Sequence, residues 1–149
     1  MVTVSAPGKV HLIGEHAVVY GEPAIIAAIG KRCYVEAEEA SDVRIESREL
    51  DTERIYPLSE TVDFTNNVQK LWDDGSAAKN FSQLFEFMRK DSIYPAKAAV
   101  GKALISMGIN SGVTIRILTD IPIGSGLGSS SSLAVAIVKA IAELYGKNL

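Results

Sequence analysis

The sequence has little of several features that would point to particular protein classes. A single cysteine among 149 residues excludes an internal disulfide bond and is typical of the cytoplasm, where we expect the protein to act. No apolar run approaches the roughly 18 residues needed to span a bilayer, and the first residues do not resemble a signal segment, so we expect no membrane partner. Basic residues number 15 against 18 acidic ones, a net charge of -3, which argues against nucleic acid as a partner.

The length and composition are those of one globular unit. A chain of 149 residues with 47% hydrophobic content can bury its own core, so we expect residues 1–149 to form a single domain. Because the chain has no overall basic character, any affinity for phosphate must come from a local arrangement of donors.

Such an arrangement is indicated by the segment from Pro122 to Ser132, Pro-Ile-Gly-Ser-Gly-Leu-Gly-Ser-Ser-Ser-Ser. Glycine at every second position allows a tight turn with exposed N–H groups, and the serines begin an apolar helix pattern. The first N–H groups of a helix have no internal partner, and the helix dipole is positive at that end. We therefore predict a phosphate-binding loop, because the strand before it and the helix after it argue against a flexible linker.

The loop belongs to neither of the two familiar nucleotide-binding patterns. A Walker A loop has lysine directly after its last glycine, where this chain has Ser129, and the spacing of Gly124, Gly126 and Gly128 is not that of a dinucleotide fingerprint. Phosphate charge must then be met by the backbone, by a cation from elsewhere in the chain and by a metal. The hydroxyls of Ser129 and Ser130 are suitable ligands for Mg²⁺.

A second segment, Ser5 to Gly21, carries Lys9 before an apolar strand pattern and the pair Glu15-His16 after it. On the residues alone, these are equally well read as solvated charges at two strand ends. His16 by itself is more often a hydrogen-bonded structural histidine than a catalytic one.

Apolar periodicity predicts an α+β domain, in which strands come first, then helices, then one more strand and helix. We expect strands at residues 3–6, 10–13, 33–37, 43–46 and 113–117, with a Pro7–Gly8 turn between the first two and an irregular connection at 50–57. A first helix, with Phe64, Val68, Leu71 and Trp72 on one face, is expected to end at Asp74-Gly75-Ser76. A second, with Phe81, Leu84, Phe85 and Met88 on one face, is expected to stop near Asp91-Ser92, and a third to run from about Pro95 to Met107. The last begins at the serines of the loop and is capped by Gly146. It has an apolar face of Leu133, Ile137, Ile141 and Leu144.

Together the two segments resemble the GHMP small-molecule kinases. The pattern S-A-P-G-K-x-x-L-x-G-E-H-A-V-V-Y-G-x-P-A is matched from Ser5 to Ala24, and P-x-G-x-G-L-G-S-S is matched from Pro122 to Ser130. The resemblance implies a fold like the second domain of ribosomal protein S5, with a mixed sheet packed against helices. Where the family often has alanine after the two serines, this chain has Ser131 and Ser132, a difference we expect to matter little.

The resemblance also implies roles for particular residues. Lys9 would be catalytic and lie near the substrate, with Glu15 and His16 also on the substrate side. ATP would be held by Pro122, Gly124, Ser125, Gly126, Leu127, Gly128, Ser129 and Ser130. Ser130, together with Ser129, would bind Mg²⁺.

Within the family, the first segment is most similar to that of the mevalonate kinases of the archaeal or bacterial type. Galactokinases carry arginine and asparagine where Lys9 and His11 stand, and phosphomevalonate kinases lack the G-E-H-A-V-V-Y run. The implied reaction is ATP-dependent phosphorylation of mevalonate to 5-phosphomevalonate. The alternatives are another GHMP kinase, of the galactokinase or phosphomevalonate kinase type, and a non-catalytic nucleotide-binding fragment.

In this family about as much chain again follows the helix after the glycine loop. That half carries a glutamate that binds Mg²⁺ and an aspartate that acts as base, whereas the only acidic residue after Gly128 here is Glu143. We therefore expect this chain to be an N-terminal half that is inactive without its C-terminal half. We also expect that the uncovered surface favours a homo-oligomer.

Overall fold

The computed structural model describes residues 1–149 as one mixed sheet covered by helices. Strands β1 (Val2–Ile13), β2 (Ile25–Ala40), β3 (Val43–Ser47), β4 (Thr52–Tyr56) and β5 (Gly112–Thr119) lie in the order β1-β2-β5-β3-β4. Strands β3 and β5 pair in parallel, and all the other neighbours pair antiparallel. The predicted α+β class with a mixed sheet is confirmed.

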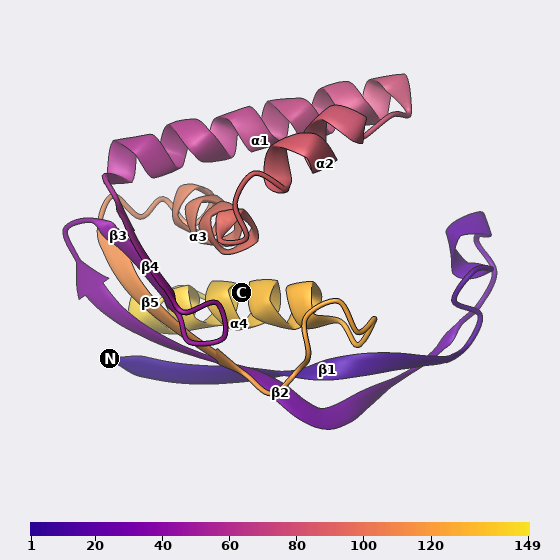
Figure 1. The fold of residues 1–149 in the computed structure, drawn as a ribbon. Coiled ribbons are helices and arrows are strands. Elements are labelled where there is room, and N and C mark those ends of the chain that lie inside the picture. The colour runs from indigo at the N-terminus through magenta and orange to yellow at the C-terminus, as the bar shows by residue number, and fades with distance from the viewer.

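The helices lie on one face of this sheet (Figure 1). They are α1 (Leu58–Ala78), α2 (Ser82–Met88), α3 (Tyr94–Ser106) and α4 (Ser129–Leu144). Helix α4 packs directly on β1 and β2, α3 packs beside α4, and α1 lies over α3. None of these helices has the length and apolar character needed to cross a membrane.

The core forms because side chains alternate across the strands. In β2 the side chains of Cys33, Val35 and Ala37 are buried toward the helices, while those between them point to the open face of the sheet. Helix α4 meets this layer with Ile137 and Ile141, both fully buried, as the apolar spacing predicts. Each such isoleucine contributes about 1.5–3 kcal/mol of burial free energy, so this layer anchors α4 and the loop that precedes it.

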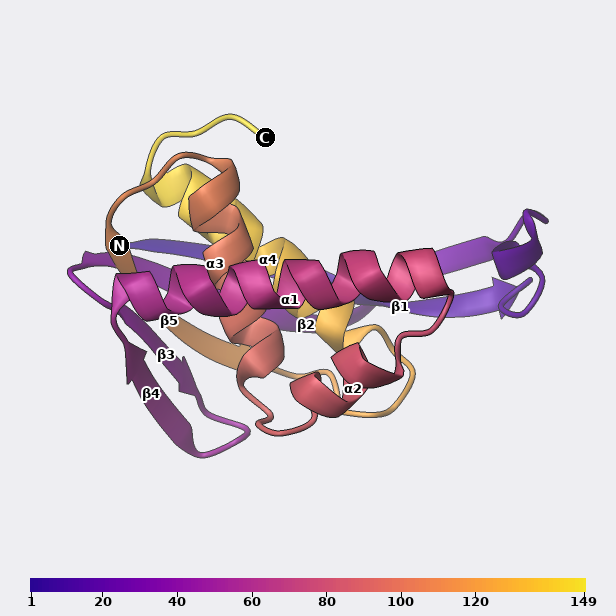
Figure 2. The same ribbon diagram turned by 90° about the horizontal axis from the view of Figure 1, so that it is seen from above.

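The outer part of the β1–β2 hairpin, residues 10–28, extends beyond the helices and is called the arm below (Figure 2). Its tip holds the short 3-10 helix Val18–Tyr20. Large apolar side chains are exposed along it, including Ile13 (68% exposed) and Tyr20 (86%). An uncovered apolar surface of this kind is typical of an interaction site.

The prediction of a turn at Pro7–Gly8 is wrong, because β1 continues through both residues. Between the Pro7–Arg32 and Lys9–Ala28 pairs, β1 contributes one residue and β2 contributes three. The irregularity therefore lies mainly in β2, and β1 remains a single strand with a shift of register.

Two further expectations are also wrong. Residues 52–56 form edge strand β4 rather than an irregular connection, because their backbone pairs with β3 although most of their side chains are exposed. Helix α1 passes through Gly75 to Ala78, and its C-cap, Lys79, has φ +50°. Phe81 packs so closely on Gly75 that an added Cβ would lie 2.8 Å from Phe81 Cδ1, so a larger side chain at position 75 would not fit without a shift.

Candidate functional site

The glycine loop joins β5 to α4 and has the backbone conformation that its sequence predicts. Gly124, Gly126 and Gly128 have φ angles of +75°, +74° and +79°, in the left-handed region that favours glycine. Ser125 steadies the turn, because its Oγ donates to the carbonyl oxygen of Pro122 at 2.7 Å. The three glycines therefore serve the shape of the loop.

At the end of the loop, Gly128 is the N-cap of α4 and provides no side-chain hydrogen bond to the helix. The first turn of α4 carries no acidic residue either. Its N–H groups are consequently available to an external acceptor, and the helix dipole makes an anion the favoured one.

Lys9 brings a positive charge to this loop from the other end of the sequence. Its Nζ donates to the carbonyl oxygen of Gly126 at 3.3 Å and lies 3.1 Å from Nδ1 of His11. Its backbone N–H donates to the carbonyl oxygen of Leu127 at 2.9 Å. Lys9 is thus a cation from a distant part of the sequence that lies at the loop, where it can supply the positive charge that the loop does not contain.

Lys9 and the loop enclose a shallow cavity of about 270 Å³, and no hydrophobic residue lines it. Its lining consists of Lys9, Gly124, Ser125, Gly126, Gly128, Ser129, Ser130 and Ser131. Lys9 is the one charged residue in this set, so the cavity combines an ammonium group, serine hydroxyls and free backbone N–H groups. This combination favours phosphate.

Pro122 and Leu127, which were also expected to bind ATP, do not line this cavity. Their carbonyl oxygens accept hydrogen bonds from Ser125 and Lys9. In the structure they therefore support the shape of the loop.

A second, mainly apolar pocket of about 160 Å³ shares Ser129 and Ser130 with the phosphate cavity. Its apolar lining includes Cys33, Ile93, Ala96, Ile117, Ile123 and Leu133. These residues come from β2, β5, α4 and the segments around α3 and the loop, so no local sequence pattern could have indicated the pocket. A ligand with phosphates and a flat apolar ring could occupy both spaces.

Glu15 and His16 lie on the arm, in the segment that follows β1. Both are exposed, and their side chains make no hydrogen bond or ion pair within the chain. The arm tip is separate from the glycine loop in both ribbon views (Figures 1 and 2). The structure thus unites Lys9 with the loop and leaves Glu15 and His16 apart from it.

Sequence reasoning did not select His11 as a site residue. Its contact with Lys9 could have been anticipated, because residues two apart on a strand point to the same face. Since the ammonium group of Lys9 carries only donors, Nδ1 of His11 must be the acceptor in this contact.

The hydroxyls of Ser129 and Ser130 stand at the first turn of α4 beside the cavity, as a Mg²⁺ site shared with phosphate would require. Mg²⁺ keeps several waters and is commonly held by few protein ligands together with phosphate oxygens. The chain contains no cluster of three or more His, Cys, Asp or Glu side chains that could hold a metal by itself. The residues present fit an ion that arrives with phosphate.

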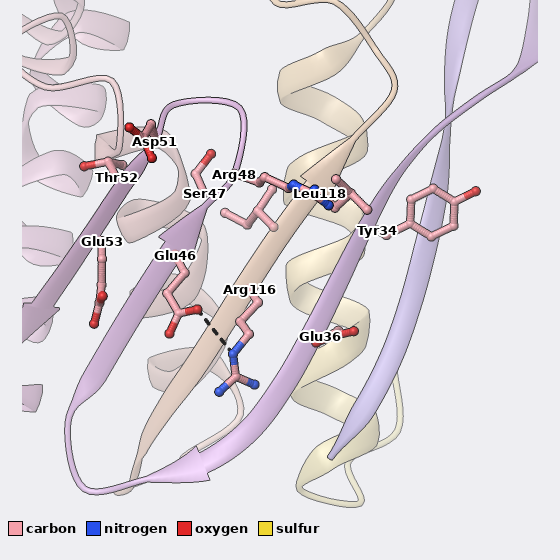
Figure 3. A pocket seen from close by; sticks show the side chains of 11 residues that line it. Tyr34, Glu36, Glu46, Ser47, Arg48, Asp51, Thr52, Glu53, Arg116 and Leu118 are labelled. Atoms are coloured by element: carbon pink, nitrogen blue, oxygen red, sulfur yellow. Dashed lines mark ion pairs between the residues drawn. The ribbon is translucent and has the colours of Figure 1, made fainter.

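The largest hollow, about 570 Å³, lies elsewhere, on the open face of the sheet (Figure 3). Arg116 there pairs with Glu46 at 3.3 Å and with Glu38 at 3.2 Å, and Arg44 extends the series to Glu53 at 3.3 Å. Opposite charges across neighbouring strands are typical of a solvated sheet face. We assign this hollow no ligand.

Comparison with known proteins supports a kinase-like domain. Residues 93–149 match the family model for the GHMP kinases N terminal domain, and residues 2–39 match the galactokinase galactose-binding signature. Curated mevalonate kinases from Thermococcus sibiricus and Pyrococcus furiosus are each 38% identical over 151 residues, which cover 99% of this chain. The chain spans 40% of the length of these relatives.

Among solved structures, the Methanococcus jannaschii mevalonate kinase matches with a TM-score of 0.76 and 29% identity. The match covers 99% of this chain and 41% of that one. The sequence and structure comparisons therefore both find mevalonate kinases, and both match about 40% of their length.

Proposed function

The chain carries a GHMP kinase N-terminal domain, and on this premise we propose that the whole protein transfers the γ-phosphoryl group of ATP to mevalonate. The observation that carries the proposal is the contact of Lys9 with the glycine loop, where its Nζ lies 3.3 Å from the Gly126 carbonyl oxygen. Phosphoryl transfer depends mainly on positioning and on stabilising charge at the transferred group. A lysine held at the rim of a phosphate cavity supplies both.

In this proposal the segment Gly124–Ser130 holds the triphosphate. The free N–H groups at the start of α4 and the loop backbone bind its oxygens, and the apolar pocket beside Ser129 and Ser130 receives the base. Ser130, together with Ser129, holds Mg²⁺, which when bound would neutralise phosphate charge. Lys9 stabilises the charge that develops during transfer.

Glu15 and His16 serve the acceptor alcohol. Both are exposed beyond the end of β1 and apart from the glycine loop, so this role rests on the resemblance of residues 5–24 to the family motif and not on the geometry of the loop. Mevalonate is the substrate favoured by the similarity to curated mevalonate kinases over nearly the entire chain.

A further region of the whole protein completes the site. The phosphate cavity has no carboxylate in its lining, and Glu49 in the adjoining pocket already accepts the Thr119 N–H at 2.8 Å. A base within hydrogen-bond reach of the acceptor hydroxyl and a carboxylate ligand for Mg²⁺ are both expected. Glu143 belongs to the last turn of α4 and is paired with Lys139 at 3.1 Å. We propose that the missing groups come from a C-terminal region that also covers the apolar arm.

A coupled assay with ATP, Mg²⁺ and mevalonate tests the proposal. Residues 1–149 alone should give no turnover, and addition of the separately produced C-terminal region should restore it. Turnover near about 1 s⁻¹ by residues 1–149 alone, at the lower end for kinases, would contradict the assignment of the base and the metal carboxylate to another region.

Two alternatives remain distinguishable in the same assay. The galactokinase signature over residues 2–39 favours a sugar substrate, so the whole protein should be offered galactose and phosphomevalonate beside mevalonate. A non-catalytic nucleotide-binding module would bind ATP by calorimetry yet phosphorylate none of the three.

A further inference from the structure

Ser132 in the second turn of α4 makes a contact that the sequence pattern did not indicate. Its side chain is buried, with 4% of the residue exposed. Its Oγ lies 2.7 Å from the carbonyl oxygen of Pro7 and 2.9 Å from that of Gly128. Because the hydroxyl carries one hydrogen, it donates to the closer oxygen, that of Pro7, and so links α4 to β1; its approach to the Gly128 oxygen is ordinary for serine in a helix.

The Pro7 carbonyl can accept this bond because β1 and β2 lose their regular register at this point. Pairing shifts between Pro7 and Lys9, so this stretch of β1 is opposed by an irregular part of β2. Gly8, between them, faces the glycine loop so closely that an added Cβ would lie 2.9 Å from the carbonyl oxygen of Leu127. Close approach of the two backbones therefore depends on glycine at position 8.

A second hydrogen bond fixes the same pair of segments. The N–H of Lys9 donates to the carbonyl oxygen of Leu127 at 2.9 Å. The Lys9 side chain then crosses Gly128, where an added Cβ would lie 2.8 Å from its Cγ. The Pro7–Lys9 segment is thus held at Leu127 by its backbone and at Ser132 by a side chain.

From this geometry we infer that Ser132 is a positioning residue for Lys9. Its hydroxyl, by holding Pro7 against the first turns of α4, fixes the place of the Lys9 ammonium group relative to phosphates in the loop. Ser132 does not line the phosphate cavity, so it acts through Lys9 and not on the ligand. The inference rests on the proposed function, since it assigns Lys9 to phosphoryl transfer.

Thr65 provides a matched control. It is also buried, at 4% exposed, and its Oγ1 donates to the carbonyl oxygen of Thr61 at 2.7 Å, one turn earlier in α1. Ser132→Ala and Thr65→Val each remove one buried hydroxyl hydrogen bond from a helix. Only the first removes a bond to the Lys9 segment.

The first measurement is steady-state kinetics of the two variants of the whole protein. Ser132→Ala should lower kcat by about 10- to 100-fold, the loss expected when a reacting group is slightly misplaced, with KM for ATP changed less than about 3-fold. Thr65→Val should retain the wild-type kcat. Equal kcat values in the two variants would overturn the inference, as would a Ser132→Ala effect confined to KM.

The second measurement needs no substrate. Hydrogen exchange of the Lys9 amide in the whole protein should be at least about 10-fold faster in Ser132→Ala, because the bond to Leu127 loses its support. Thr65→Val should leave this amide at its wild-type rate, and unchanged exchange in Ser132→Ala would contradict the inference. If exchange is faster in Ser132→Ala but the wild-type protein phosphorylates none of the three substrates, the contact is confirmed and the proposed function is refuted.

Discussion

The ammonium group of Lys9 donates a hydrogen bond to the carbonyl oxygen of Gly126, 3.3 Å away and 117 residues later in the chain. Phosphate loops of the Walker A type contain their own lysine, but here the cation and the loop belong to separate elements. The packing of α4 on β1 must therefore bring them together. The predictions below test the loop, the cation, a buried ion pair and a buried thiol.

The loop conformation should be necessary for ATP binding. Gly126 has φ +74°, and an added Cβ would meet nothing within 4 Å, so Gly126→Val imposes a conformational cost without a clash inside the protein. That cost of about 1–2 kcal/mol should raise the Kd for ATP by about 5- to 30-fold. Gly146→Val is the control, with φ +62° and open space after the far end of α4, and it should leave the Kd unchanged. Calorimetry that finds equal Kd values would refute the assignment of the loop.

Lys9 should contribute to the reaction step more than to ATP binding. Lys9→Met should lower kcat of the whole protein by at least about 100-fold, as on removal of a preorganised charge. Lys31→Met is the control, because Lys31 also donates to a backbone carbonyl, that of Asp120, at 3.3 Å. A kcat close to wild type in both variants would reduce Lys9 to a surface charge at the edge of the loop.

The ion pair between Lys97 and Glu60 should be sensitive to which partner is removed. Lys97 has 3% of its side chain exposed and lies 3.5 Å from the Tyr56 ring centroid, whereas Glu60 is 54% exposed and 2.6 Å from Lys97 Nζ. Glu60→Ala leaves a buried ammonium group without its carboxylate and should lower the free energy of unfolding, measured in urea, by about 1–3 kcal/mol. Lys97→Met leaves only an exposed carboxylate without its partner and should lower the free energy of unfolding by less than Glu60→Ala does.

The exposed pair of Lys139 and Glu143 in α4 is the control for that experiment. Glu143→Ala should change the free energy of unfolding by less than about 0.5 kcal/mol. If Glu60→Ala had no larger effect than Glu143→Ala, burial of Lys97 would not matter to stability.

Cys33 should make the fold sensitive to alkaline pH. Burial, with a smaller contribution from the charge of Glu49, raises the pKa of its thiol from 9.0 to about 11, although a hydrogen bond with Thr119 acts in the opposite direction. The unfolded chain therefore loses this proton near pH 9 while the folded chain keeps it, so the contribution of the thiol to stability is complete below pH 9 and is lost as pH rises to about 11. Urea unfolding from pH 8.5 to 10.5 should show a fall about 1–2 kcal/mol greater in wild type than in Cys33→Ala. Parallel pH profiles would show that Cys33 ionises equally in both states.

Sequence patterns predicted elements wherever the local signal agreed with the packing. The spacing of apolar residues in α4 was matched by burial of Ile137 and Ile141, and Gly108 follows α3 with φ +65°, as expected of a glycine at a helix end. The pattern failed at β4 and at Gly75. At β4 the outcome was decided by backbone pairing with β3, a contact from outside the segment, while at Gly75 the helix continues and the glycine fits closely against Phe81.

The sequence by itself determined the glycine conformations of the loop, the helix that follows it and the family to which the two segments point. These properties depend on local backbone sterics and on the order of residues along the chain. Only the tertiary structure decided that Lys9 reaches Gly126, that the hydroxyl of Ser132 bonds to Pro7, and that Glu15 and His16 stand apart on the arm. Such contacts join segments more than 100 residues apart, and their geometry follows from how α4 packs on β1, which no local pattern records.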